Sequence, residues 1–117
     1  EPELVLADEE ESDEKESKSY TFSQLDALLN DARTAYENGE FEKALDCINK
    51  FVENSNTKLD EGYFLRGQIL EAVSNVRDIK EALHSYSTVT SSFPQSPLYE
   101  KALAREKYIK RLYFNIR

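Results

Sequence analysis

The sequence predicts an all-α fold made of two helix-turn-helix units and a C-terminal closing helix. Three observations lead to this prediction. Apolar residues recur every three or four positions in five successive segments. Helix breakers are few, with three Gly and three Pro in 117 residues, and residues that favour helices are abundant. No segment alternates apolar and polar residues as a half-buried strand does.

The first helical hairpin is expected to begin after Tyr20. Thr21 and Gln24 have the spacing of a capping box, in which the hydroxyl caps the first turn and the amide reaches back. Gly39 is suited to the left-handed conformation that ends a helix. The second helix follows after about three residues, so the two helices must be antiparallel neighbours. Their apolar positions are Leu25, Leu28, Leu29, Ala32, Ala35 and Tyr36, then Phe41, Ala44, Leu45, Ile48, Phe51 and Val52.

The second hairpin repeats this pattern. Thr57 or Asp60 is expected to start a third helix, whose apolar positions extend to Val73. A loop over residues 74–77 then leads to a fourth helix, for which Asp78 supplies the cap. The two hairpins together predict one compact core.

The last segment is expected to form the closing helix. Ser96 stands at the N-cap position, and Pro97 follows at the first helical position, where its missing N–H costs no hydrogen bond. The segment is basic, and we expect its cations on a solubilising outer face, with contacts to the acidic tail, an anionic partner or a lipid surface as alternatives. These cations are Lys101, Arg105, Lys107, Lys110, Arg111 and Arg117.

The chain divides into an acidic segment over residues 1–19 and a folded domain over residues 20–117. The first segment holds nine acids and two bases and little that is apolar, so it is expected to be a disordered linker or tail. The sequence contains no Met and begins with Glu1. We therefore expect a processed form or a piece of a longer protein, whose upstream part could hold a signal peptide or a lipid anchor.

Several classes of function are disfavoured by the composition. The net charge of −8 argues against a nucleic-acid partner, because phosphate contacts require a basic face. No run approaches the roughly 20 apolar residues that span a bilayer. The single His84 and single Cys47 offer neither a metal site nor a nucleophile–base pair, and no glycine-rich loop is present to bind phosphate. We expect no enzymatic activity, cofactor or metal.

An internal repeat of roughly 34 residues resembles the tetratricopeptide repeat (TPR). The phrase Phe93-Pro94-Gln95-Ser96-Pro97, followed by Ala102, is similar to the turn that joins repeats in bacterial cell-envelope TPR proteins. These include the outer-membrane assembly lipoprotein and Tol-Pal-associated coordinator types. The alignment pairs Ala44 with Ala82, Leu45 with Leu83, Ile48 with Tyr86, Phe51 with Val89, Asn56 with Pro94, and Ala32 with Gly67.

The resemblance implies a right-handed TPR superhelix whose first helices line a short groove. It implies a scaffold or adaptor that binds a peptide or helix of another protein, within a larger envelope-associated or periplasmic protein. A cytoplasmic location is the alternative, and a structural spacer without a ligand is the alternative function. The residues carried over to partner binding are Arg33, Tyr36, Phe64 and Gln68, beside Leu29, Asn30, Glu37, Leu65 and Glu71 on the same inner face.

Overall fold

The computed structural model describes residues 20–114, and over this range the predicted all-α class is confirmed. It contains five helices and no strand within these residues: α3 (Phe22–Glu37), α4 (Phe41–Asn54), α5 (Leu59–Glu71), α6 (Ile79–Ser92) and α7 (Tyr99–Tyr113). The disorder expected for residues 1–19 concerns residues outside this range.

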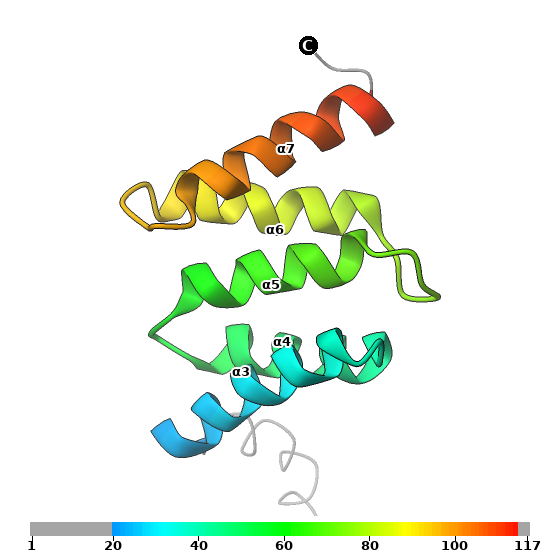
Figure 1. Cartoon of the computed structure of the whole chain (residues 1–117). Coiled ribbons are helices and arrows are strands. Elements are labelled where there is room, and N and C mark those ends of the chain that lie inside the picture. The colour runs from blue at the N-terminus through cyan, green and yellow to red at the C-terminus, as the bar shows by residue number, and fades with distance from the viewer. Residues whose placement is uncertain (1–19, 115–117) are drawn as a thin grey trace, which may run out of the picture.

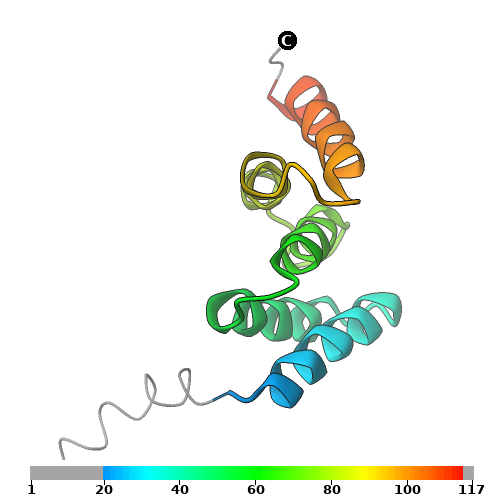
Figure 2. The same cartoon turned by 90° about the vertical axis from the view of Figure 1, so that its left-hand side faces the viewer.

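The helices form an elongated stack of antiparallel neighbours, with α3 and α7 at opposite ends (Figure 1). Each helix packs on the next one in the chain, from α3 to α7. The stack measures 61 by 31 by 28 Å. A view from the side shows that the chain zigzags: α3, α5 and α7 lie on one side, and α4 and α6 on the other (Figure 2).

The capping interactions predicted at three helix ends are formed. The hydroxyl of Thr21 accepts the N–H of Gln24 at 3.1 Å, and the Gln24 amide accepts the N–H of Thr21 at 2.8 Å, which completes the capping box. Gly39 has a φ of +80°, the left-handed conformation that favours glycine. The carboxylate of Asp78 caps α6 by accepting the N–H of Glu81.

Three helix boundaries differ from the predictions. α5 begins at Leu59 after the N-cap residue Lys58, and not at Thr57 or Asp60. It ends at Glu71, so Val73 lies outside the helix and is 83% exposed. The chain turns there because the N–H of Asp78 donates to the carbonyl of Leu70 at 2.9 Å.

The closing helix α7 begins at Tyr99, two residues later than predicted, and Ser96 is not its N-cap. The Ser96 hydroxyl instead accepts the N–H of Leu98 at 3.0 Å and donates to Asp60 at 2.5 Å. These two bonds hold residues 96–98 in a turn against the start of α5.

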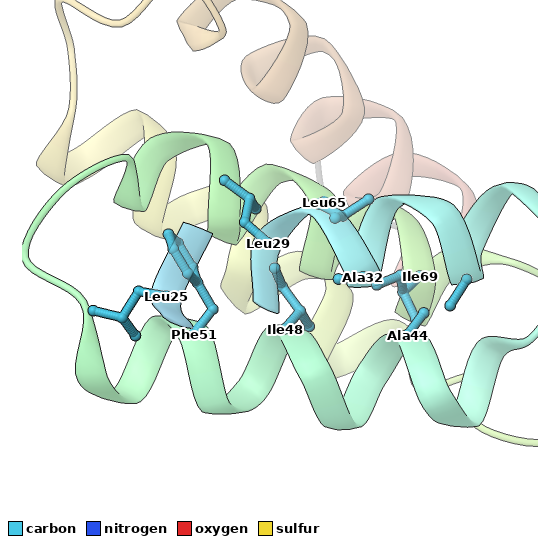
Figure 3. Close-up of a cluster of buried hydrophobic side chains, with 9 residues drawn as sticks. Leu25, Leu29, Ala32, Ala44, Ile48, Phe51, Leu65 and Ile69 are labelled. Atoms are coloured by element: carbon cyan, nitrogen blue, oxygen red, sulfur yellow. The ribbon is translucent and has the colours of Figure 1, made fainter. Parts of the chain in front are cut away.

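The core consists of two clusters that meet at α5. Figure 3 shows the first, in which α3 and α4 interdigitate and α5 adds Leu65 and Ile69. The second joins α6 and α7 to the end of α5, with Tyr86 and Ile109 fully buried. Ala44 and Ala82, which the repeat predicts to be positions of close helix approach, are both 0% exposed. The first cluster contains Leu25, Leu29, Ala32, Ala35, Ala44, Ile48, Phe51, Leu65 and Ile69.

A half-buried arginine joins the two hairpins. Arg66 on α5 has a side chain that is only 17% exposed. Its guanidinium donates to Asn49 of α4 at 2.7 Å and to Ser85 of α6 at 2.8 Å. It also lies 3.4 Å from the carboxylate of Glu81. The charge is thus satisfied where a buried cation would otherwise be costly.

Gly67 is predicted to be a position where even a methyl group destabilises the fold. A Cβ there would lie 2.8 Å from the ring of Tyr86, which is 1% exposed. We expect Gly67→Ala to destabilise by about 1–2 kcal/mol, because overpacking exceeds the gain in helix propensity. Urea unfolding measures this change.

The control for Gly67→Ala is the same substitution in a Tyr86→Leu background. Without the ring the added methyl group has space, so the substitution should then be neutral or stabilising. An equal loss in both backgrounds would show that the ring contact is not the cause.

Candidate functional site

α3, α5 and α7 lie on one side of the stack (Figure 2). Residues from all three helices, or directly next to them, line a groove. It consists of two hollows that adjoin, because both are lined by Phe64 and Gln68. The Leu98 hollow, of about 410 Å³, is lined by Arg33, Asp60, Glu61, Phe64, Leu65, Gln68, Pro97 and Leu98. The Tyr36 hollow, of about 350 Å³, is lined by Tyr36, Phe64, Gln68, Glu71, Ala72, Val73, Tyr86 and Arg105.

The structure brings the four predicted binding residues together in this groove. Arg33 lies on the wall of the Leu98 hollow, Tyr36 on the wall of the Tyr36 hollow, and Phe64 and Gln68 between them. All four are half-buried.

The other predicted inner-face positions are divided. Leu65 and Glu71 line the groove. Leu29 does not, because it is 2% exposed and belongs to the core. Asn30 and Glu37 are exposed and lie outside the two linings.

Arg105 is in the groove and not on an outer solubilising face, which corrects the prediction for the closing helix. Its guanidinium pairs with the carboxylate of Glu71, and lies 4.4 Å from the centre of the Tyr108 ring. The repeat does not locate it, because the 35-residue step from Arg33 to Gln68 leads next to Leu103. α7 nevertheless contributes Arg105 to the lining of the Tyr36 hollow.

Three polar side chains in the lining of the Tyr36 hollow, Tyr86, Glu71 and Arg105, contact one another. The hydroxyl of Tyr86 donates to Glu71 at 2.9 Å, and Glu71 pairs with Arg105. The Glu71 side chain is 15% exposed. Its hydrogen bond with Tyr86 and its ion pair with Arg105 connect α5 to α6 and α7. Burial, followed by the negative charge of Glu71, raises the pKa of Tyr86 well above its usual value of 10.0.

The groove aromatics also pack on their neighbours. The ring of Tyr36 meets Phe41 edge-on at 5.9 Å between centres, and Phe64 meets Tyr86 at 5.5 Å. Such contacts restrict the orientation of each ring, and both Tyr36 and Phe64 also line the groove.

Asp60 lines the Leu98 hollow and is held there by two hydrogen bonds. One carboxylate oxygen accepts the Ser96 hydroxyl at 2.5 Å, and the other accepts the N–H of Glu61 at 2.9 Å. Among residues 20–114, no Lys or Arg forms an ion pair with it. Sequence reasoning missed Asp60 as a groove residue, because the pattern placed it only at a helix start.

The remaining reactive side chains form no cluster in the described part of the chain. Within it, no group of three or more His, Cys, Asp and Glu residues is placed to hold a metal ion. His84 is exposed on α6. Cys47 is half-buried, and burial followed by Asp31 and Asp46 raises the pKa of its thiol. None of the helices between residues 20 and 114 has both the length and the apolarity needed to cross a membrane.

Comparison with known proteins finds similar segments within longer proteins of two spirochaetes. An uncharacterized protein of Treponema pallidum is 34% identical over 90 residues, which cover 75% of this chain and 17% of the relative. An uncharacterized protein of Borreliella burgdorferi is 34% identical over 77 residues, which cover 64% of this chain and 22% of the relative. The chain thus spans about a fifth of the length of these relatives. No protein-family model matches the chain, and no solved structure matches it.

The raised pKa of Tyr86 predicts a pH-dependent stability. Because the folded pKa lies above the unfolded one, the contribution is complete below about pH 10 and is lost as pH rises further. Tyr86→Phe should cost about 1–2 kcal/mol at pH 8 through the lost bond to a charged acceptor. Above pH 10 the difference between wild type and variant should shrink by up to about 1.4 kcal/mol per pH unit.

Urea unfolding at pH 8, 10 and 11 measures both effects. Tyr108→Phe is the matched control, since Tyr108 is 45% exposed and should change neither stability nor its pH dependence. Parallel pH profiles for wild type and Tyr86→Phe would contradict the assignment.

Proposed function

We propose that this domain is a protein-interaction module of the tetratricopeptide type. In this proposal the groove on α3, α5 and α7 binds a segment of another protein. The observation that carries the proposal is the convergence of Arg33, Tyr36, Phe64 and Gln68 in one groove with half-buried aromatic walls. Aromatic and arginine side chains contribute most of the energy at protein interfaces.

The repeat of position supports the tetratricopeptide assignment. The small buried residues Ala32, Gly67 and Ala102 follow one another at intervals of 35 residues on α3, α5 and α7. Ala44 and Ala82 are fully buried in the second helix of each hairpin. A right-handed superhelix of two helix-turn-helix units and a third first helix is consistent with this arrangement.

The size of the hollows favours an extended peptide as ligand. Volumes of about 410 and 350 Å³ accommodate a few side chains each, and the two hollows adjoin at Phe64 and Gln68. The walls are already fixed by the contacts of Tyr36 with Phe41 and of Phe64 with Tyr86. Binding therefore loses little side-chain entropy in the protein, which favours a useful affinity from a small area.

A place within a larger bacterial envelope protein is part of the proposal. Its support is the turn over residues 93–97, which resembles that of envelope TPR proteins, together with similar segments inside much longer spirochaete proteins.

A structural spacer is the second candidate function. The observation in its favour is that Arg33 and Arg105 are already paired with carboxylates from neighbouring helices. Such pairs would hold a rigid rod even without a ligand.

The groove hypothesis is tested by affinity capture with the full chain as bait in a lysate of the source cells. We expect Tyr36→Ala combined with Phe64→Ala to abolish capture of the partner. Because both rings also pack on the protein, Arg33→Ala combined with Gln68→Ala provides a second test that leaves the aromatic contacts intact. Circular dichroism and melting must show that each variant is folded.

The matched control changes the exposed cations of α7. Lys107→Glu with Arg111→Glu should leave capture intact, since both side chains are exposed and absent from the groove lining. If this variant alone loses the partner, and wild-type binding falls steeply with salt, the basic helix is the site. If no variant changes what is captured, the spacer function is favoured.

A further inference from the structure

The charges of the groove lining cancel except at one position. The lining holds the cations Arg33 and Arg105 and the carboxylates of Asp60, Glu61 and Glu71. Arg33 pairs with Glu61 at 2.6 Å, and Arg105 pairs with Glu71. Asp60 is therefore the one charged side chain of the groove lining that forms no ion pair among residues 20–114.

The carboxylate of Asp60 is held in place between two hollows. It lines the Leu98 hollow and also a neighbouring hollow of about 400 Å³ between the loops before α5 and α7. Ser96 and the N–H of Glu61 each occupy one site on its oxygens. Each carboxylate oxygen has a second lone pair, so both can accept a further charge-assisted bond.

An apolar surface lies beside this carboxylate. Phe64, Leu65 and Leu98 line the same hollow as Asp60, and Pro97 completes its wall. Leu65 and Phe64 belong to α5, so they are fixed relative to Asp60 by the helix itself. The hollow thus offers an apolar contact and a single negative charge at a fixed separation.

We propose that the groove selects an extended peptide with an aliphatic residue two positions from a lysine or arginine. The aliphatic side chain enters the Leu98 hollow and the cation pairs with Asp60. Side chains at positions i and i+2 of an extended chain point to the same side, which places both against the groove floor. This inference rests on the proposed function and specifies its ligand.

The charge of the wider surface agrees with a cationic ligand. The described residues, 20–114, carry fourteen acids and twelve bases, a net charge of −2. The exposed cations Lys101, Lys107 and Arg111 of α7 are not among the groove-lining residues. The two cations of the lining, Arg33 and Arg105, are each paired with a carboxylate, which leaves Asp60 to attract a basic peptide.

The experiment measures binding of three labelled nonapeptide pools to the full chain by fluorescence anisotropy. Their central sequences are Lys-Xaa-Leu-Xaa-Lys, Glu-Xaa-Leu-Xaa-Glu and Lys-Xaa-Ser-Xaa-Lys, with Xaa a mixture of small residues. The symmetric design makes the result independent of peptide direction. We expect the first pool to bind about tenfold more tightly than either other pool, equivalent to about 1.4 kcal/mol.

Two substitutions at Asp60 test its role. Asp60→Asn keeps an acceptor for Ser96 and should remove the preference for the Lys-Xaa-Leu-Xaa-Lys pool over the Glu-Xaa-Leu-Xaa-Glu pool. Asp60→Lys should reverse that preference. The matched control is Asp46→Asn, because Asp46 is 66% exposed on α4 and pairs with Lys50 away from the groove lining. This control should keep the wild-type preference.

The outcomes separate this inference from the proposed function. Equal binding of the Lys-Xaa-Leu-Xaa-Lys and Glu-Xaa-Leu-Xaa-Glu pools would overturn the role of Asp60 but leave a peptide groove. The same conclusion follows if Asp60→Asn still prefers the first of these pools. Absence of binding by every pool at millimolar concentration overturns the peptide groove and this inference with it. Salt provides a test without any variant. Raising NaCl from 50 to 500 mM should weaken the binding of the Lys-Xaa-Leu-Xaa-Lys pool to the wild-type chain several-fold.

Discussion

The structure depends on the close approach of two helices to α5. Gly62 lets Phe51 of α4 approach, since a Cβ there would lie 2.9 Å from its ring. Gly67 does the same for Tyr86 of α6. The two glycines are five residues apart, about 140° around the helix, so they serve different neighbours. Glycine costs a helix interior about 1 kcal/mol, and close packing on both faces offsets this cost.

This packing determines where the groove can form. With two faces of α5 covered by α4 and α6, its remaining face carries Phe64, Gln68 and Glu71 at helical spacing. α3 and α7 lie on that same side of the stack, because successive antiparallel helices alternate (Figure 2). The groove is therefore a consequence of the core and needs no separate structural element.

Local signals in the sequence predicted much of the fold. Helix periodicity, the Thr21 capping box and the left-handed Gly39 involve residues close in the chain, so the pattern was sufficient. The starts and ends that were wrong depend on distant partners. Ser96 bonds to Asp60, 36 residues away, and the N–H of Asp78 returns to Leu70. Local spacing cannot reveal such tertiary bonds.

The candidate site was predicted in part, for a similar reason. The repeat aligned α3 with α5 and so gathered Arg33, Tyr36, Phe64 and Gln68. It treated α7 as a closing helix and gave no signal for Arg105. The 35-residue step that joins the buried Ala32 and Gly67 leads next to the buried Ala102, and the same step from Gln68 leads to Leu103.

The ion pairs of the groove also connect its helices. Arg33–Glu61 links α3 to α5, and Glu71–Arg105 links α5 to α7, in each case between helices that are not consecutive in the chain. Partly exposed pairs contribute at most about 1 kcal/mol each, so their main effect is on the relative placement of the helices. The same contacts neutralise the lining. We therefore expect the proposed ligand to be selected by shape and by the single charge of Asp60, because the other charges of the lining are already paired.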